Sequence, residues 1–357
     1  MPSKFFPEAR MMLIGSQPLE DYGEASDLVF EYAGEIPNWA QLPVYPQELM
    51  VPQFAGGLPG LVDTGEKLYA DTGAQDFEAE LLAFFEEYLA AVESSCPDDD
   101  SRFALTPRIA KGFFTFLDGL ARERLGLSAV KGQVTGPITF CTALKDQEGR
   151  AIFYHDALRD AAVKLLALKA AWQVEKLSAF KVPVILFIDE PALAGYGSSE
   201  LISISREQIA GPLAEVTAAI HEHGGLAGVH VCANTDWSIL LNSSVDIINF
   251  DAYGYFDKFI LYGDQIKVFL ERGGSLAWGL VPTLVAEEVE KADLETIWRL
   301  WKDQSTRIQS LGIDAQTLMR QSFITPSCGT GSLPRDLSLK VLKLTRELSR
   351  RIRDSIT

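Results

Sequence analysis

The sequence predicts an α/β fold, a (β/α)8 TIM barrel built as a single domain over residues 1–357. Short apolar runs rich in β-branched residues alternate with longer stretches that have helical spacing. The short runs are apolar throughout, as expected for parallel strands that are covered on both faces. The length of 357 residues suits eight strand–helix units. A doubly wound sheet is the competing arrangement, but no G-x-G-x-x-G turn follows a predicted strand.

Each predicted element has its own pattern. Seven apolar runs predict strands at Met11–Ser16, Ala129–Thr135, Pro183–Asp189, Leu226–Cys232, Asp246–Asp251, Ser275–Val281 and Gln321–Thr325. The segment Leu49–Phe54 could supply an eighth strand. Helical spacing predicts helices over Ala74–Ser94, Thr106–Leu125, Asp156–Ala179, Ser205–His223, Ala286–Leu311 and Leu337–Ile356. Residues 18–73 are rich in Pro and Gly and are predicted as a non-helical loop or insertion region, and loops of that size are usually functional.

The composition excludes several classes of protein. A hydrophobic fraction of 47% is enough for a core, so the chain is not a disordered one. Lys and Arg number 32 and Asp and Glu 49, which gives a net charge of −17 and argues against nucleic acid or an anionic membrane as a partner. The apolar runs are too short to span a bilayer, and Met1–Arg10 lacks the apolar segment of a signal peptide. With four Cys and four His, we expect a cytoplasmic protein without a disulfide scaffold.

Polar residues follow the predicted strands at the ends where a barrel carries its chemistry. These ends read Ile14-Gly15-Ser16, Thr135-Gly136-Pro137, Ile188-Asp189-Glu190-Pro191, His230-Val231-Cys232, Phe250-Asp251 and Ser327-Cys328-Gly329. Because the carboxyl ends of parallel strands lie together, the sequence predicts that these residues form one site.

The strongest signal in this set is His230-x-Cys232. Residues two apart on a strand point to the same side, so the imidazole and the thiol project together. Cys328 at another strand end would add a second sulfur, and one nitrogen with two sulfurs suits Zn²⁺, completed by a carboxylate or water. The alternative is that both Cys are small buried apolar residues and His230 is a hydrogen-bonded core residue. Cys96 and Cys141 are assigned loop and packing roles.

Acidic residues end two of the strands. Asp251 could be a metal ligand, could orient a ligand, or could cap a helix. Asp189 and Glu190 follow a buried apolar run and need partners there, either a substrate ammonium or a neighbouring Lys or Arg. The backbone N–H groups and the hydroxyl of Gly15-Ser16 suit a substrate carboxylate.

Together these motifs resemble the C-terminal catalytic barrel of the cobalamin-independent methionine synthase family. The barrel shares a superfamily with uroporphyrinogen decarboxylase and zinc-dependent methylcobamide methyltransferases, and the resemblance runs from about Met11 to the last strand. It implies zinc held by His230, Cys232, Asp251 and Cys328, although the family normally has Glu at the third position. It also implies homocysteine lying against Ile14, Gly15 and Ser16, with Asp189 near its ammonium group. The matching motifs are Ile14-Gly15-Ser16, Thr135-Gly136-Pro137, the D-E-P-A-L run from Asp189 to Leu193, His230-x-Cys232 and Cys328.

The sequence departs from the family on the side of the methyl donor. The family's complete enzymes have an additional N-terminal barrel, a folate-contacting Trp after T-G-P, a Glu after D-E-P-A-L, and a general-acid His on the seventh strand. Here Thr139–Leu144 has no Trp, Ala194-Gly195-Tyr196 replaces the Glu, and Trp278–Thr283 has no His. These departures favour methylcobalamin or a methylated corrinoid protein as the donor, because a methylfolate must be protonated by an acid whereas Co(I) is a good leaving group.

The sequence therefore predicts a zinc-dependent methyltransferase of methionine biosynthesis that converts L-homocysteine into methionine. Three alternatives stay open. A related corrinoid methyltransferase could act on another thiol such as coenzyme M, although its sulfonate would not use Asp189. A porphyrinogen-decarboxylase-like enzyme would need an Arg-rich N-terminal segment, and Arg10 is the only Arg before Arg102. A non-catalytic corrinoid carrier would bind without turnover.

Overall fold

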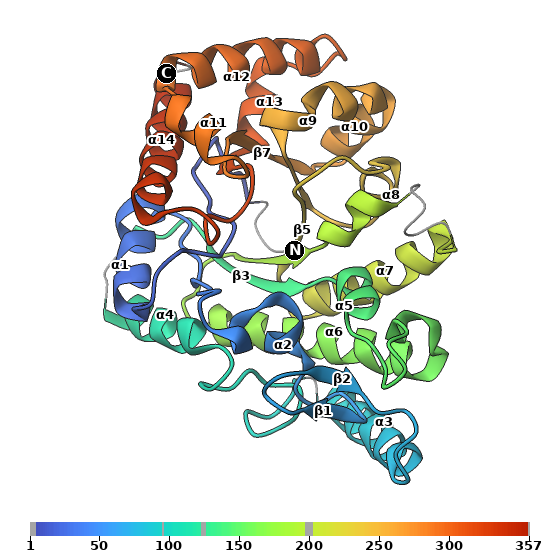
Figure 1. The fold of residues 1–357 in the computed structure, drawn as a ribbon. Helices are drawn as coiled ribbons and strands as arrows, with labels where there is room; N and C mark the ends of the chain where they lie inside the picture. The colour runs from blue at the N-terminus through green and yellow to red at the C-terminus, as the bar shows by residue number, and fades with distance from the viewer. Residues whose placement is uncertain (1–4, 95, 123–125, 197–202, 356–357) are drawn as a thin grey trace.

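The computed structural model describes residues 5–94, 96–122, 126–196 and 203–355. Its central feature is a six-stranded sheet in which consecutive strands are parallel neighbours, so each connection crosses over through helices. Figure 1 shows the strands in the middle of the molecule with helices around them. The strands are β3 (Val130–Thr135), β4 (Val184–Asp189), β5 (Leu226–Val231), β6 (Ile247–Phe250), β7 (Ser275–Val281) and β8 (Ser322–Pro326).

The predicted (β/α)8 barrel is wrong, because in the described part of the chain the parallel sheet is open and has six strands rather than eight. The predicted strand Met11–Ser16 makes only isolated bridges, from Met11 to Ile324 and from Ser16 to Gln41. Between these bridges the carbonyl of Ile14 accepts a hydrogen bond from the side-chain ammonium group of Lys131. In a regular ladder its partner would be a backbone amide of the neighbouring strand. The ladder is therefore interrupted at Ile14.

The eighth predicted strand, Leu49–Phe54, is also wrong. Leu49 precedes a short helix, α2 (Met50–Ala55), in which Gln53 and Phe54 are completely buried. The Gln53 side chain donates to the carbonyl of Ile109 at 2.9 Å and accepts from Gln41 at 2.5 Å. A six-residue apolar run does not distinguish a strand from a buried helical turn by its spacing.

The other six predicted strands are confirmed to within two residues, and so are three of the six predicted helices. The predicted helix Ala286–Leu311 is two helices, α11 (Ala286–Lys291) and α12 (Leu294–Gln309), because Asp293 caps α12 by accepting from the Thr296 amide at 2.9 Å. The remaining long predicted helices correspond to α3 (Phe77–Glu93), α4 (Lys111–Arg122), α6 (Asp156–Ser178), α7 (Arg206–Glu222) and α14 (Arg335–Asp354). The predicted residues 123–125 and Ile356 lie outside the described part of the chain.

The sequence predicted residues 18–73 as a non-helical region, but this region contains helices. It contains α1 (Tyr22–Ala33), which Asp21 caps and which packs against α4, and the hairpin of β1 (Leu61–Asp63) and β2 (Leu68–Ala70). The shorter helices elsewhere are α5 (Pro137–Ala143), α8 (Ser238–Leu241), α9 (Ala252–Phe259), α10 (Gly263–Glu271) and α13 (Ala315–Arg320), with 3₁₀ turns at Pro46–Glu48, Ile152–Tyr154, Pro191–Gly195 and Ile260–Tyr262.

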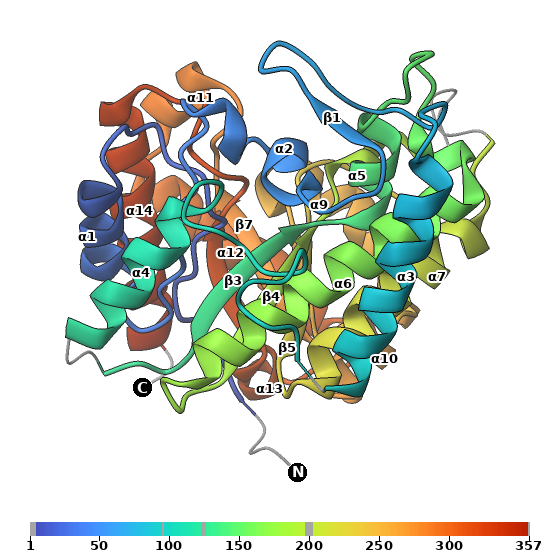
Figure 2. The same ribbon diagram turned by 90° about the horizontal axis from the view of Figure 1, so that it is seen from below.

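One face of the sheet changes character along its strands. At the strand starts it carries a buried apolar cluster that includes Ile185, Phe187, Ile247 and Phe323. At the strand ends a lateral row of paired residues runs across β3 to β6: Thr135, Asp189, His230 and Asn249. Because residues paired across parallel strands point to the same face, this row gathers polar groups at one end of the sheet. Figure 2 shows that end, with α2 and α5, opposite the end that carries α13.

In the described part of the chain no helix combines the length and apolarity needed to cross a membrane.

Candidate metal centre

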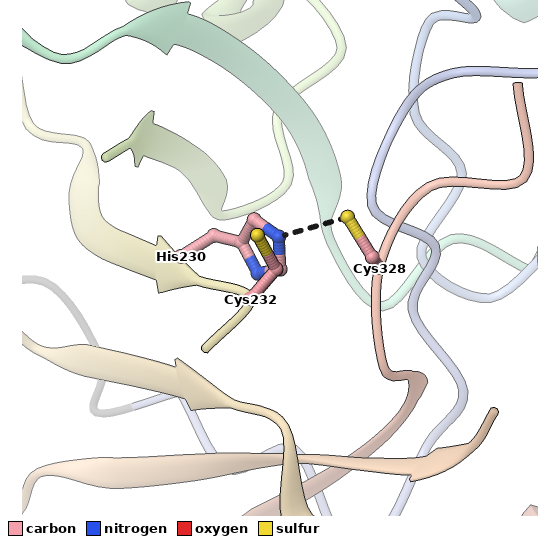
Figure 3. A group of neighbouring side chains, drawn as sticks. All are labelled: His230, Cys232 and Cys328. Carbon is pink, nitrogen blue, oxygen red and sulfur yellow. Dashed lines mark hydrogen bonds between the residues drawn. The ribbon is translucent and has the colours of Figure 1, made fainter. Parts of the chain in front are cut away.

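Three of the predicted zinc ligands come together at the strand ends. His230 and Cys232 are at the end of β5 and Cys328 follows β8, and their donor atoms all lie within 4.8 Å of one another. The His230 Nε2 atom is 3.6 Å from the Cys328 sulfur, and Figure 3 shows the two strand ends presenting these groups to each other. His230 is buried and both thiols are half-buried. A group of one imidazole and two thiols could hold a metal ion, and its donors are those that Zn²⁺ prefers.

The proton on His230 is placed by Asn249, a residue that the sequence reasoning missed. Asn249 is completely buried on β6, and its Nδ2 donates to the Ala277 carbonyl at 2.9 Å and to the Thr325 hydroxyl at 2.8 Å. Both amide hydrogens are thus used, so the oxygen faces the Nδ1 atom of His230 and accepts from it. The unprotonated nitrogen of the neutral imidazole is therefore Nε2, the atom that faces Cys328. In the sequence, Asn249 is the only polar residue in the run Ile247–Phe250, and this isolated position could have pointed to a specific hydrogen-bonding role.

The two thiols differ in their tendency to lose a proton: Cys232 ionises more easily than an ordinary thiol and Cys328 less easily. The pKa of Cys232 is lowered, because the thiol of Cys328 donates to it and the His230 imidazole lies beside it. The pKa of Cys328 is raised by the same contact and by burial. Because thiol ligands bind a metal as thiolates, the lowered pKa of Cys232 favours metal binding.

Asp251 is the predicted ligand that does not join this group. Its buried carboxylate caps α9 by accepting from the Gly254 amide at 2.8 Å, which is one of the three roles that the sequence left open. Burial raises the pKa of Asp251 to about 6, against the lowering effect of that hydrogen bond. Among the described residues, His230, Cys232 and Cys328 form the only group of three or more possible metal ligands whose donor atoms all lie within 4.8 Å of one another, and Asp251 is not part of it.

Asp189 provides a carboxylate oxygen without a partner. It is paired in register with His230, and its Oδ1 atom is buried with no hydrogen bond to any described residue. Burial raises the pKa of Asp189, while the nearby charges of His230 and Lys131 lower it. No Lys or Arg of the described residues lies within ion-pair distance of Asp189. The oxygen is available to a cationic ligand.

Lys131 is a second buried charge that the sequence did not reveal. Its ammonium group donates to the Ile14 carbonyl and, at 3.3 Å, to the Gln133 side chain. Burial lowers its pKa to about 8, and the charge of Asp189 opposes that change. Lys131 thus fixes the backbone of the Ile14-Gly15-Ser16 segment.

Glu190, whose partner the sequence left open, has a structural role. Its completely buried carboxylate accepts from the amides of Ile138 and Thr139 at 2.8 Å and from the Thr139 hydroxyl at 2.7 Å, in the first turn of α5. Burial raises the pKa of Glu190 to about 7 despite these bonds. The Gly of the T-G-P motif is required here, because a Cβ on Gly136 would lie 2.2 Å from the Glu190 carboxyl carbon.

The Ile14-Gly15-Ser16 segment holds the loop that carries Cys328. The Ser16 carbonyl accepts from the Thr330 amide at 2.9 Å, and its hydroxyl accepts from the Gly331 amide at 3.3 Å. The amide N–H groups of Gly15 and Ser16 have no partner among the described residues. Unpaired N–H groups in this arrangement are able to donate to a carboxylate.

Comparison of the sequence with models of protein families and with curated proteins finds no match. The resemblance to the methionine synthase family therefore stays a prediction from the motifs.

Proposed function

We propose that this protein is a zinc-dependent methyltransferase that transfers a methyl group to the thiol of L-homocysteine and forms methionine. The observation that carries the proposal is the imidazole and two thiols within 4.8 Å of one another, next to a buried carboxylate oxygen that has no partner. The first group suits a thiol-activating metal and the second suits the ammonium group of an amino acid.

His230, Cys232 and Cys328 would hold the zinc ion. They are three ligands, the number that catalytic zinc sites commonly use. Zinc bound there would lower the pKa of a thiol ligand, so that the homocysteine sulfur is a thiolate at neutral pH.

The chain's own residues would select the acceptor. Asp189 Oδ1 would accept from the substrate ammonium, and the free N–H groups of Gly15 and Ser16 would donate to its carboxylate. A site with a buried unpaired carboxylate discriminates against thiols that lack an ammonium group, because such thiols leave that carboxylate without a partner. This favours homocysteine over a coenzyme-M-like acceptor.

The donor is proposed to be methylcobalamin or a methylated corrinoid protein. The homocysteine sulfur forms a bond to the methyl carbon, the cobalt–carbon bond breaks, and both of its electrons stay on cobalt as Co(I). The thiol proton leaves to solvent. Transfer from methylfolate would instead need an acid at the folate nitrogen, and the segment Trp278–Thr283 supplies none.

The test supplies zinc-loaded protein with homocysteine and either methylcobalamin or methyltetrahydrofolate, and measures methionine. We expect methionine with methylcobalamin and little with methyltetrahydrofolate. 2-Mercaptoethanesulfonate serves as the matched acceptor without an ammonium group. Absence of methionine with both donors, or equal use of the two acceptors, would contradict the proposal.

A further inference from the structure

We propose that a second binding site, for a small organic anion with an apolar body, lies at the opposite end of the sheet from the metal centre. A cavity of about 750 Å³ opens there between the starts of β4, β5, β6 and β7. The metal-binding group lies at the ends of these strands, so the cavity is separate from it.

The floor of the cavity is apolar, and the described residues cover it incompletely. It belongs to the buried cluster on the sheet face, against which Phe5 and Leu226 pack while remaining half-buried. The rings of Phe5 and Phe323 lie 6.1 Å apart between centroids. Such a floor suits the aliphatic or aromatic part of a ligand.

The rim of the cavity is cationic, although the protein has a net charge of −17. Lys181, His221 and Arg272 line it together with Asp246. Asp246 is already engaged, because its Oδ2 atom pairs with His221 Nε2 at 2.7 Å and accepts from the Ala227 amide at 2.8 Å. Within the described residues neither Lys181 nor Arg272 has a carboxylate partner. Two unpaired cations therefore remain for an anion.

The backbone holds Lys181 where glycine would be easier to accommodate. Two helix-to-strand turns at this end pass through a left-handed glycine, Gly224 before β5 (φ +81°) and Gly273 before β7 (φ +98°). Before β4 that residue is Lys181, with φ +59°. A residue with a Cβ is disfavoured in this conformation, so its presence indicates a use for the side chain.

Arg272 is exposed, but contacts with the protein hold its guanidinium in place. Its guanidinium donates to the Ser243 carbonyl and lies 5.1 Å from the centroid of the Phe269 ring. A fixed guanidinium and an ammonium beside an apolar floor match a ligand with one anionic group and an apolar body.

The experiment titrates the full-length protein with 8-anilinonaphthalene-1-sulfonate, an aromatic anion whose fluorescence rises on binding. We expect saturable binding, and we expect Lys181→Gly to raise Kd by about fivefold or more, the effect of losing about 1 kcal/mol from one charge pair. The same substitution suits the backbone and should raise Tm slightly, so weaker binding could not be attributed to unfolding. Arg272→Gln should also weaken binding. Lys291→Ala, which removes an exposed cation outside the cavity, is the matched control and should not.

Binding without saturation, or the same Kd in Lys181→Gly and the unaltered protein, would overturn the inference. Zinc content and methionine formation are read separately at the other end of the sheet. Failure of this site is thereby distinguishable from failure of the proposed function.

Discussion

Asn249 connects the metal centre to the interior of the sheet. Its amide hydrogens are fixed by β7 and β8, and its oxygen fixes the proton of His230 on β5. A histidine that ligates zinc through one nitrogen depends on such a partner at the other. The site is therefore organised across four neighbouring strands rather than by its ligands alone.

Replacing Asn249 should weaken metal binding without removing a ligand. We expect Asn249→Ala to lower zinc affinity by about 10- to 100-fold, because the imidazole loses its orienting acceptor. Competition with a chromophoric chelator measures this change, and thermal unfolding checks the fold. Asn242→Ala, at the end of α8, is the control. Unchanged zinc affinity in Asn249→Ala would show that the tautomer is set by other groups.

Asp189 is expected to control the choice of acceptor rather than the metal. Loss of a hydrogen bond between charged groups is worth about 1.5–3 kcal/mol, so Asp189→Asn should lower kcat/KM for homocysteine by about 10- to 100-fold. Zinc content and the slow reaction of 2-mercaptoethanesulfonate should stay the same. A parallel loss with both acceptors would instead assign Asp189 to the metal centre.

The junction of β3 and α5 shows how a motif can be structural. Glu190 occupies the space that a side chain at Gly136 would need, and it caps the first turn of α5. We expect Gly136→Ala to destabilise the protein by about 1–3 kcal/mol through overpacking. Gly211→Ala in α7, where a Cβ meets nothing within 4 Å, should stabilise by up to about 1 kcal/mol. Denaturant unfolding measures both, and equal effects of the two substitutions would contradict the packing argument.

The element boundaries show what the sequence could predict. Apolar runs that are buried on both faces identified β3 to β8, because that burial leaves a continuous apolar pattern. The runs Met11–Ser16 and Leu49–Phe54 have the same pattern. In the first, a hydrogen bond from Lys131 interrupts the pairing with neighbouring strands. In the second, the hydrogen bond of Gln53 to Ile109 anchors the segment as a helix. These contacts join residues far apart in the chain, so local patterns do not reveal them.

The candidate site was predictable to the same extent. His230, Cys232, Cys328 and Asp189 lie in or just after the last residues of strands, and their chemistry is visible from residue type and position. Asn249 and Lys131 lie inside strands that read as apolar, and their roles depend on which strands are neighbours. Asp251 has the same position after a strand as the ligands do, but its carboxylate is used by α9.

At the scale of the whole molecule, His221 and Asp246 couple stability to pH. The hydrogen bond to Asp246 raises the pKa of His221 above its ordinary value. The folded state thus binds this proton more tightly than the unfolded state. The resulting stabilisation is fully present below the ordinary histidine pKa of about 6.5, and it is lost as the pH rises through the raised pKa of His221 in the folded protein. Because the pair is partly exposed, we expect it to contribute at most about 1 kcal/mol.

We therefore expect His221→Asn to reduce the free energy of unfolding more at about pH 5.5 than at about pH 8.5. His223→Asn, at the neighbouring histidine, is the control. Chemical denaturation at the two pH values measures the difference. A larger effect at the alkaline pH would reverse the sign and exclude the ion pair as its cause.

Methionine formation at a controlled zinc content tests whether the metal centre activates a thiol for methyl transfer. The protein is stripped of metal with a chelator, divided, and assayed with homocysteine and methylcobalamin before and after one equivalent of zinc is restored, beside a Cys328→Ser variant treated in the same way. We expect methionine from the zinc-restored protein, and loss of both tight zinc binding and methionine formation in the variant. Methionine formed equally without zinc, or zinc binding and turnover unchanged in Cys328→Ser, would contradict it.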